Sequence, residues 1–114
     1  AASQETGALS LRRRALLHIA QNLDDPGLTP AGVASAVGGN QRELQRAFQK
    51  TGETMQGVIL EQRLTRAATL LQARPGQYRK KITRLAIALG FNDAAYFSRA
   101  FARRYGVPPS RYSG

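Results

Sequence analysis

Apolar residues recur along this chain at helical spacing, and polar or glycine-rich breaks separate them. Near the start, four apolar residues stand at i, i+3, i+4 and i+7, namely Leu16, Ile19, Ala20 and Leu23. This spacing predicts a helix over about residues 10–22 that buries one stripe. The run Asp-Asp-Pro-Gly at 24–27 predicts its end. No strand is expected, because Val, Ile and Thr do not alternate with polar residues over more than four positions.

Two shorter helices are predicted next, with glycines between them. Thr29 followed by Pro30 is typical of a helix start, with threonine as the cap and proline in the first turn. The two glycines at 38–39 break that helix, and Asn40 is the expected cap of the following one. The second helix has a buried side made of Leu44, Ala47 and Phe48, and it ends at Thr51-Gly52.

The second half of the chain repeats this alternation after a longer helix. That helix begins near Thr54 and ends at Pro75-Gly76, and its apolar stripe is Leu64, Ala67, Ala68 and Leu71. A short helix carrying Ile82, Leu85, Ala86 and Leu89 follows. Gly90 then turns the chain, and either Asn92 or Asp93 caps the last main helix, whose inward residues are Phe97, Ala100 and Phe101. We therefore predict an all-α fold of about seven helices.

The chain also contains an internal repeat. Its matching positions, displaced by 52 to 54 residues, are Ala34 and Gly38 with Ala86 and Gly90, Leu44-x-Arg46-x-Phe48 with Phe97-x-Arg99-x-Phe101, and Gly52 with Gly106. Helices that cross steeply need a small residue at the contact and a turn residue that tolerates positive φ, which alanine and glycine supply. One copy alone favours a plain helical hairpin. Two copies with an arginine at the same place favour a pair of helix-turn-helix units.

Charge indicates the class of partner. Seventeen Lys and Arg against seven Asp and Glu give a net charge of +10, and residues 75–114 hold eight of the basic groups and one acidic group, Asp93. A polyanion is the expected partner, either nucleic acid or an anionic membrane surface. The membrane alternative is disfavoured because there is no Trp and all four Phe fit in or beside the repeats. Non-specific DNA compaction is a further alternative, which a row of Gln and Arg at residues 41–46 disfavours.

Several function classes lack the residues they need. There is no cysteine, so disulfides and thiolate metal sites are excluded, and a reducing cytoplasm is compatible. The single histidine, His18, lies near Leu16 and Ile19, where a structural role is expected. No apolar run approaches the ~20 residues that span a bilayer. We expect no enzyme activity and no metal or cofactor.

Three segments resemble the AraC/XylS family of bacterial regulators. The second unit carries GFNDAAYFSRAFARRYGVPPSRY, the first carries LTPAGVASAVGGNQRELQRAFQKTG, and QRLTRAATLL resembles the family's linker helix. The resemblance runs from about Leu11 to Tyr112. It departs at Met55, where proline is frequent, and at Val58, where an aromatic residue is frequent. Lys81 replaces the usual Ser or Thr cap, so we expect the next helix to begin at Thr83.

The resemblance implies a DNA-binding domain with two helix-turn-helix subdomains. The implied divisions are a linker remnant at 1–9, a first subdomain at 10–53, a linker helix at 54–74 and a second subdomain at 75–114. The implied function is sequence-specific transcription regulation, as an activator or repressor, in the bacterial cytoplasm and associated with the nucleoid. The implied partners are double-stranded DNA, RNA polymerase and an N-terminal effector or dimerisation domain that this chain lacks.

Candidate base-reading residues fall mostly in the first unit. Arg42, Arg46 and Lys50 form one basic row at i, i+4 and i+8, and glutamines stand beside it at 41, 45 and 49. Arg can grip guanine O6 and N7, and Gln can grip adenine N6 and N7. The positions that match the family's base readers are Gln41, Arg42, Gln45 and Arg46. A solvated helix face is the alternative, and it or a phosphate contact is preferred for Lys50.

The second unit is poorer in readers. Ala94 and Ala95 offer only a methyl group to thymine, Arg99 is a candidate reader, and Tyr96 is equally explained as a reader or as core packing. The residues assigned to phosphates are Asn40, Lys50, Arg79, Lys80, Lys81, Arg84 and Arg103. Arg104 and Arg111 are interpreted as solubilising charge.

The linker sets the expected binding mode. A linker of about 19 residues spans about 28 Å, close to the ~34 Å helical turn of DNA. We therefore expect one monomer to read two successive major-groove segments.

Overall fold

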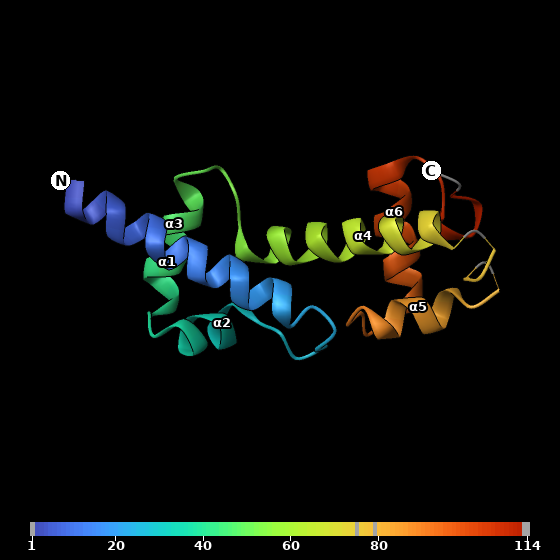
Figure 1. Cartoon of the computed structure of the whole chain (residues 1–114), viewed down its shortest axis with the longest axis horizontal. Helices are drawn as coiled ribbons and strands as arrows, with labels where there is room; N and C mark the ends of the chain where they lie inside the picture. The colour runs from blue at the N-terminus through green and yellow to red at the C-terminus, as the bar shows by residue number, and fades with distance from the viewer. Residues whose placement is uncertain (1, 75, 79, 113–114) are drawn as a thin grey trace. The chain divides into compact units, whose positions relative to one another are not determined.

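The computed structural model describes residues 2–74, 76–78 and 80–112, with the side chains of the first helix described from Ser10 onward. Its helices are α1 (Ala2–Gln21), α2 (Pro30–Val37), α3 (Gln41–Gln49), α4 (Met55–Ala73), α5 (Ile82–Ala88), α6 (Ala94–Tyr105) and the 3₁₀ helix η1 (Pro109–Arg111), shown in Figure 1. No strand occurs within these ranges. The predicted all-α class and the count of about seven helices are confirmed.

The chain forms two compact units. Unit 1 comprises residues 1–23 and 27–60, and unit 2 comprises residues 24–26 and 61–114. The boundary falls inside α4, so the first part of this helix belongs to unit 1 and the remainder to unit 2. The helix predicted as a linker therefore contributes residues to both hydrophobic cores.

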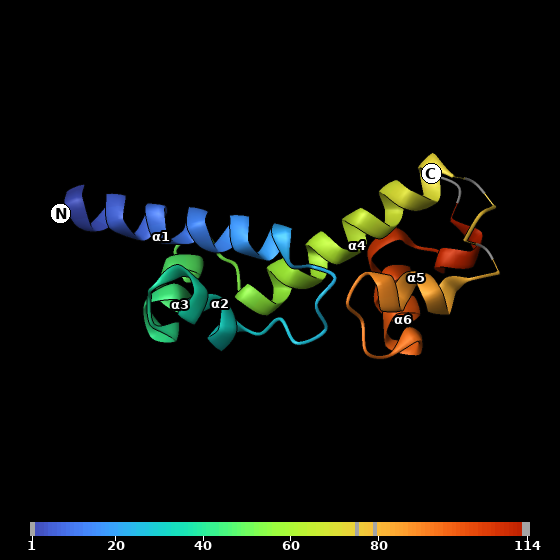
Figure 2. The same ribbon diagram turned by 60° about the horizontal axis from the view of Figure 1, so that its bottom comes forward.

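In unit 1, α1 packs against both α2 and α3, and α2 packs against α3. Figure 2 shows α1 running above these two short helices. The helix begins at Ala2 rather than near Ser10, which corrects the predicted start. Its buried row is Leu11, Ala15 and Ile19, which Leu23 continues just after the helix, whereas Leu16 and Ala20 are only half-buried. The inward face is therefore rotated from the predicted stripe, because a spacing of four keeps one row against α2 and α3.

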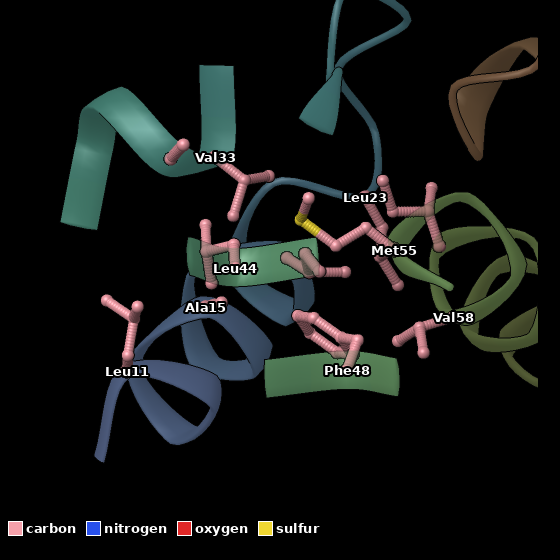
Figure 3. Close-up of a cluster of buried hydrophobic side chains, with 11 residues drawn as sticks. Leu11, Ala15, Leu23, Val33, Leu44, Phe48, Met55 and Val58 are labelled. Atoms are coloured by element: carbon pink, nitrogen blue, oxygen red, sulfur yellow. The ribbon is translucent and has the colours of Figure 1, made fainter. Parts of the chain in front are cut away.

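The core of unit 1 is built from all four of its helices. In Figure 3, side chains from α1, α2, α3 and the start of α4 converge on one cluster. Val33, Leu44 and Phe48 are fully buried there. Met55 and Val58, two of the three positions that depart from the family pattern, are buried in the same cluster. Both residues therefore pack the start of α4 into the core of unit 1.

Unit 2 is organised around aromatic rings. α5 and η1 each pack against α6, and the predicted α4 stripe of Leu64, Ala67, Ala68 and Leu71 is buried. The Phe97 ring centroid lies 4.8 Å from that of Phe91 and 5.9 Å from that of Phe101. Phe101 also meets Tyr112 edge-on at 5.2 Å. Tilted aromatic pairs of this kind contribute about 0.5–1.5 kcal/mol each beyond their buried area.

We predict that Phe48→Ala destabilises the chain by about 3–5 kcal/mol, because the ring is fully buried and its removal leaves a cavity. Leu17→Ala is the control, since Leu17 lies on the same unit with 59% of its surface exposed and should change stability by less than about 0.5 kcal/mol. Urea unfolding followed by circular dichroism measures both. Equal effects of the two substitutions would contradict the assigned core.

Candidate nucleic-acid interface

The same turn joins the first and second helices of each helix-turn-helix unit. Gly38 and Gly90 adopt φ values of 78° and 88°, in the left-handed region that glycine favours. The Gly39 amide donates to the Ala34 carbonyl at 3.1 Å, and the Phe91 amide donates to the Ala86 carbonyl at 3.0 Å. Both bonds are displaced by the 52 residues of the repeat. Both alanines are buried, so the predicted roles of alanine and glycine are confirmed.

Each recognition helix begins at a side-chain cap. Asn40 Oδ1 accepts from the Glu43 amide at 2.8 Å, and Asn40 Nδ2 donates to the Glu43 carboxylate. In unit 2, Asp93 rather than Asn92 is the cap, and its Oδ1 accepts from the amides of Ala95 at 2.9 Å and Tyr96 at 3.3 Å. The Asn40 side chain is therefore engaged within the helix cap, and its assignment to a phosphate stays a prediction.

The start of α5 differs from the prediction. The helix begins at Ile82, one residue before Thr83, and Lys81 occupies the cap position without a side-chain hydrogen bond. A lysine has no acceptor to offer the first amides, so this helix lacks the cap that Thr29 gives α2. Lys81 is exposed there, and its ammonium group is not used in capping.

α3 presents a polar face opposite its buried one. Its exposed residues are Gln41, Arg42, Glu43, Gln45, Arg46, Gln49 and, just after the helix, Lys50. At about 100° per residue, the basic row lies opposite Leu44 and Phe48. The glutamine row lies between them and borders a groove of about 330 Å³, whose other walls come from Pro30 and residues 53–56. The structure thus brings the predicted base readers of unit 1 together on one exposed surface.

α6 has the same backbone but different side chains. Aligning the two caps places Ala94, Ala95 and Arg99 at the positions of Gln41, Arg42 and Arg46. Ala95 and Arg99 are exposed, and Ala94 is half-buried. The alignment also places the half-buried Ser98 at the position of Gln45, a residue that the sequence analysis missed. The repeat register of 53 residues was the signal that would have found it.

Tyr96 occupies the flank of α6 rather than its exposed centre. It corresponds to Glu43 in α3, is 41% exposed, and its ring centroid lies 6.3 Å from that of Phe91. It is not a core residue, because residues of the core are almost completely covered. A reading role for Tyr96 stays a prediction.

The residues assigned to phosphates are accessible where the structure describes them. Lys50, Lys80, Lys81, Arg84 and Arg103 are all exposed, and Arg79 lies outside the described residues. Arg104 is not merely a solubilising charge, which corrects that interpretation. Its Nε donates to both carboxylate oxygens of Glu61, at 2.9 and 3.1 Å, and this bond raises the pKa of Arg104.

A second ion pair, unforeseen from the sequence, joins α1 to the segment after α3. Arg12 Nε donates to Glu53 Oε1 at 3.2 Å, and its Nη2 forms an ion pair with the same oxygen. A hydrogen bond from Thr51 and then one from Arg12 lower the pKa of Glu53. The pair links residues 41 positions apart, so no local pattern in the sequence indicates it.

The described part of the chain offers neither a metal site nor a membrane span. No three His, Cys, Asp or Glu side chains gather there in a way that would hold a metal ion. None of the described helices has the length and apolar character that crossing a bilayer requires.

The two capped, outward-facing second helices define a double helix-turn-helix domain of the DNA-binding class. A family model described as a helix-turn-helix domain matches residues 33–114. A solved regulator from Chromobacterium violaceum, described as containing an AraC-type DNA-binding domain, has a TM-score of 0.76 and 27% identity, covering 91% of this chain and 89% of that one. The chain therefore belongs to the AraC-type helix-turn-helix family of sequence-specific transcription regulators, which confirms the resemblance.

Further relatives agree with this family. The C-terminal domain of AraT, a response regulator from Geobacillus stearothermophilus, has a TM-score of 0.79 and 28% identity, covering 90% of this chain and 82% of that one. The transcriptional activator RhrA of Rhizobium meliloti is 36% identical over 94 residues, which is 82% of this chain and 29% of RhrA. The chain thus spans less than a third of the length of the curated relatives it matches.

We predict that Glu53→Gln destabilises the chain at neutral pH and that this difference shrinks in acid. The folded-state pKa of Glu53 lies below its ordinary value of 4.5, so the carboxylate stabilises the fold above that value and ceases to as pH falls through the folded pKa. Urea unfolding of both proteins from about pH 7 to about pH 3 measures the difference. A difference that stays constant over this series would contradict the assigned pair.

Proposed function

We propose that this chain regulates transcription by inserting α3 and α6 into two successive major-groove segments of double-stranded DNA. The observation that carries the proposal is the repeated surface. In each unit, one tight turn and one capped helix leave an arginine-bearing face exposed opposite a buried apolar one. A net charge of +10 supplies the attraction to phosphates that such a surface needs.

We further propose that the two units divide the work. Unit 1 offers glutamine and arginine side chains, which make two-pronged hydrogen bonds to adenine and guanine. The corresponding positions of unit 2 hold two alanines, a serine and Arg99. The alanines offer only a methyl contact, so fewer side chains of unit 2 can hydrogen-bond to bases. Most of the surplus positive charge lies in residues 75–114. Unit 1 therefore sets the sequence preference, and unit 2 contributes mainly phosphate affinity.

The whole protein extends the proposal beyond this chain. The curated relatives are more than three times as long as the matched segment. We propose that the complete protein carries an N-terminal effector or dimerisation domain and acts with RNA polymerase at promoters. A bacterial cytoplasmic location, in association with the nucleoid, belongs to the same proposal.

We predict opposite signatures for one residue of each unit. Arg46→Ala should cost about 1–3 kcal/mol on the preferred duplex and relax the preference at one base pair, because a base contact is lost. Lys80→Ala should weaken binding to all duplexes alike and flatten the slope of log K against log salt by about one unit, because one fewer counterion is released. Binding titrations with preferred and scrambled duplexes at several salt concentrations measure both.

The Arg99→Ala variant is the matched control for this experiment. Arg99 occupies the Arg46 position of the repeat and is also exposed, but Ala95 and Ser98 stand where Arg42 and Gln45 accompany Arg46. A base-specific loss at Arg99 as large as at Arg46 would refute the division of labour. Equal losses on both duplexes for Arg46→Ala would instead indicate non-specific DNA binding.

We predict that one monomer occupies one asymmetric site, because the chain carries both reading surfaces. Sedimentation of the protein with a duplex of two major-groove segments should give one chain per duplex, and a footprint should lack two-fold symmetry. A palindromic footprint occupied by two chains would contradict this binding mode.

A further inference from the structure

Three consecutive arginines on α1 have different surroundings. Leu11 and Ala15 of this helix are buried, and at about 100° per residue Arg12 and Arg14 flank them on opposite sides. Arg13 lies between the two on the exposed side. A run of three arginines in a DNA-binding domain suggests a phosphate contact, but two of these side chains turn back onto the helix-turn-helix motif.

Arg12 contacts the end of α3 in two ways. Its guanidinium forms the ion pair with Glu53, and its central carbon lies 5.6 Å from the centre of the Phe48 ring. Only 24% of the Arg12 side chain is exposed, so this arginine is much less available to DNA than Arg13. A guanidinium held over an aromatic ring and against a carboxylate is fixed in both position and orientation.

The contacts of Glu53 extend the connection into the recognition helix. The Glu53 amide donates to the Phe48 carbonyl at 3.0 Å. Thr51 Oγ1 lies 2.8 Å from the same carbonyl and 2.6 Å from Glu53 Oε1. The last turn of α3 is thus tied through Glu53 to α1. On the other flank, Arg14 Nη1 donates to the Val37 carbonyl at 2.9 Å, at the end of α2.

Glu53 also borders the reading surface. It lines the same groove as Gln45 and Gln49. Glu53 is half-buried at this groove, and the guanidinium of Arg12 compensates the charge of its carboxylate. The ion pair therefore ties the segment after α3, which forms one wall of this groove, to α1.

We propose that Arg12 is a positioning residue for base recognition, which holds α3 through Glu53 in the orientation that its glutamine and arginine side chains require. This inference rests on the proposed function, since it concerns how unit 1 acquires its sequence preference. Arg12 itself touches no base in this assignment.

The test compares Arg12→Gln with Arg13→Gln, which removes the same charge from the adjacent exposed position. The measured quantity is the ratio of the dissociation constants for scrambled and preferred duplexes at fixed salt. Arg12→Gln should lower this ratio about threefold to tenfold, the size expected for contacting residues that act together. Arg13→Gln should weaken both duplexes equally and leave the ratio unchanged. Glu53→Gln should lower the ratio as Arg12→Gln does, and the double variant should be no worse than either single one.

Arg12→Lys keeps the charge but loses the planar fork, so it should fold and lower the ratio by less than Arg12→Gln. Thermal unfolding of each variant confirms that binding is measured on folded protein. If Arg12→Gln and Arg12→Lys leave the ratio unchanged, as Arg13→Gln does, the positioning role is wrong and the proposed function stands. If the unmodified chain itself shows no preference between duplexes, both the proposed function and this inference fail.

Discussion

In each unit, the packing of the recognition helix depends on a tight turn. A backbone hydrogen bond closes this turn, from an amide to the carbonyl of an alanine five residues earlier. The bond forms because Gly38 and Gly90 adopt positive φ and because a small alanine lets the two helices cross closely. The angle fixed by this turn decides which face of α3 and α6 is buried. Once that face is buried, the opposite face is left for a ligand.

The charge of the molecule lies on its surface. No polar or charged side chain is buried in the described ranges. The exposed basic groups therefore stay hydrated, and they can exchange their counterions for phosphates. Arg12, Arg63 and Arg104 are not buried either, but the guanidinium of each also packs over an aromatic ring.

The two units show how one backbone supports different chemistry. The turn of unit 2 is one residue longer than that of unit 1. The cap Asn40 follows Gly38 by two residues, whereas the cap Asp93 follows Gly90 by three, with Asn92 between them. That extra residue accompanies Phe91, whose ring fills the space beside Phe97 at 4.8 Å. The outward-facing positions of α3 carry glutamine and arginine, whereas the corresponding positions of α6 hold the exposed Ala95 and Arg99 and the half-buried Ala94 and Ser98.

Local chemistry let the sequence alone determine the order of the helices, the turns and the family, but not the residues at which α1 and α5 begin. Glycine at positive φ, Thr29 and Asn40 as caps, and apolar residues at helical spacing each act within a few residues, so they were read correctly from one chain. The tertiary structure alone decided the inward face of α1, the side of α6 on which Tyr96 lies, and the ion pair between Arg12 and Glu53. The ion pair depends on which distant segments meet, and the other two features depend on small rotations of a helix. A pattern of neighbouring residues indicates neither of these causes. The sequence therefore specified which side chains α3 and α6 expose, whereas the contacts between distant segments came from packing.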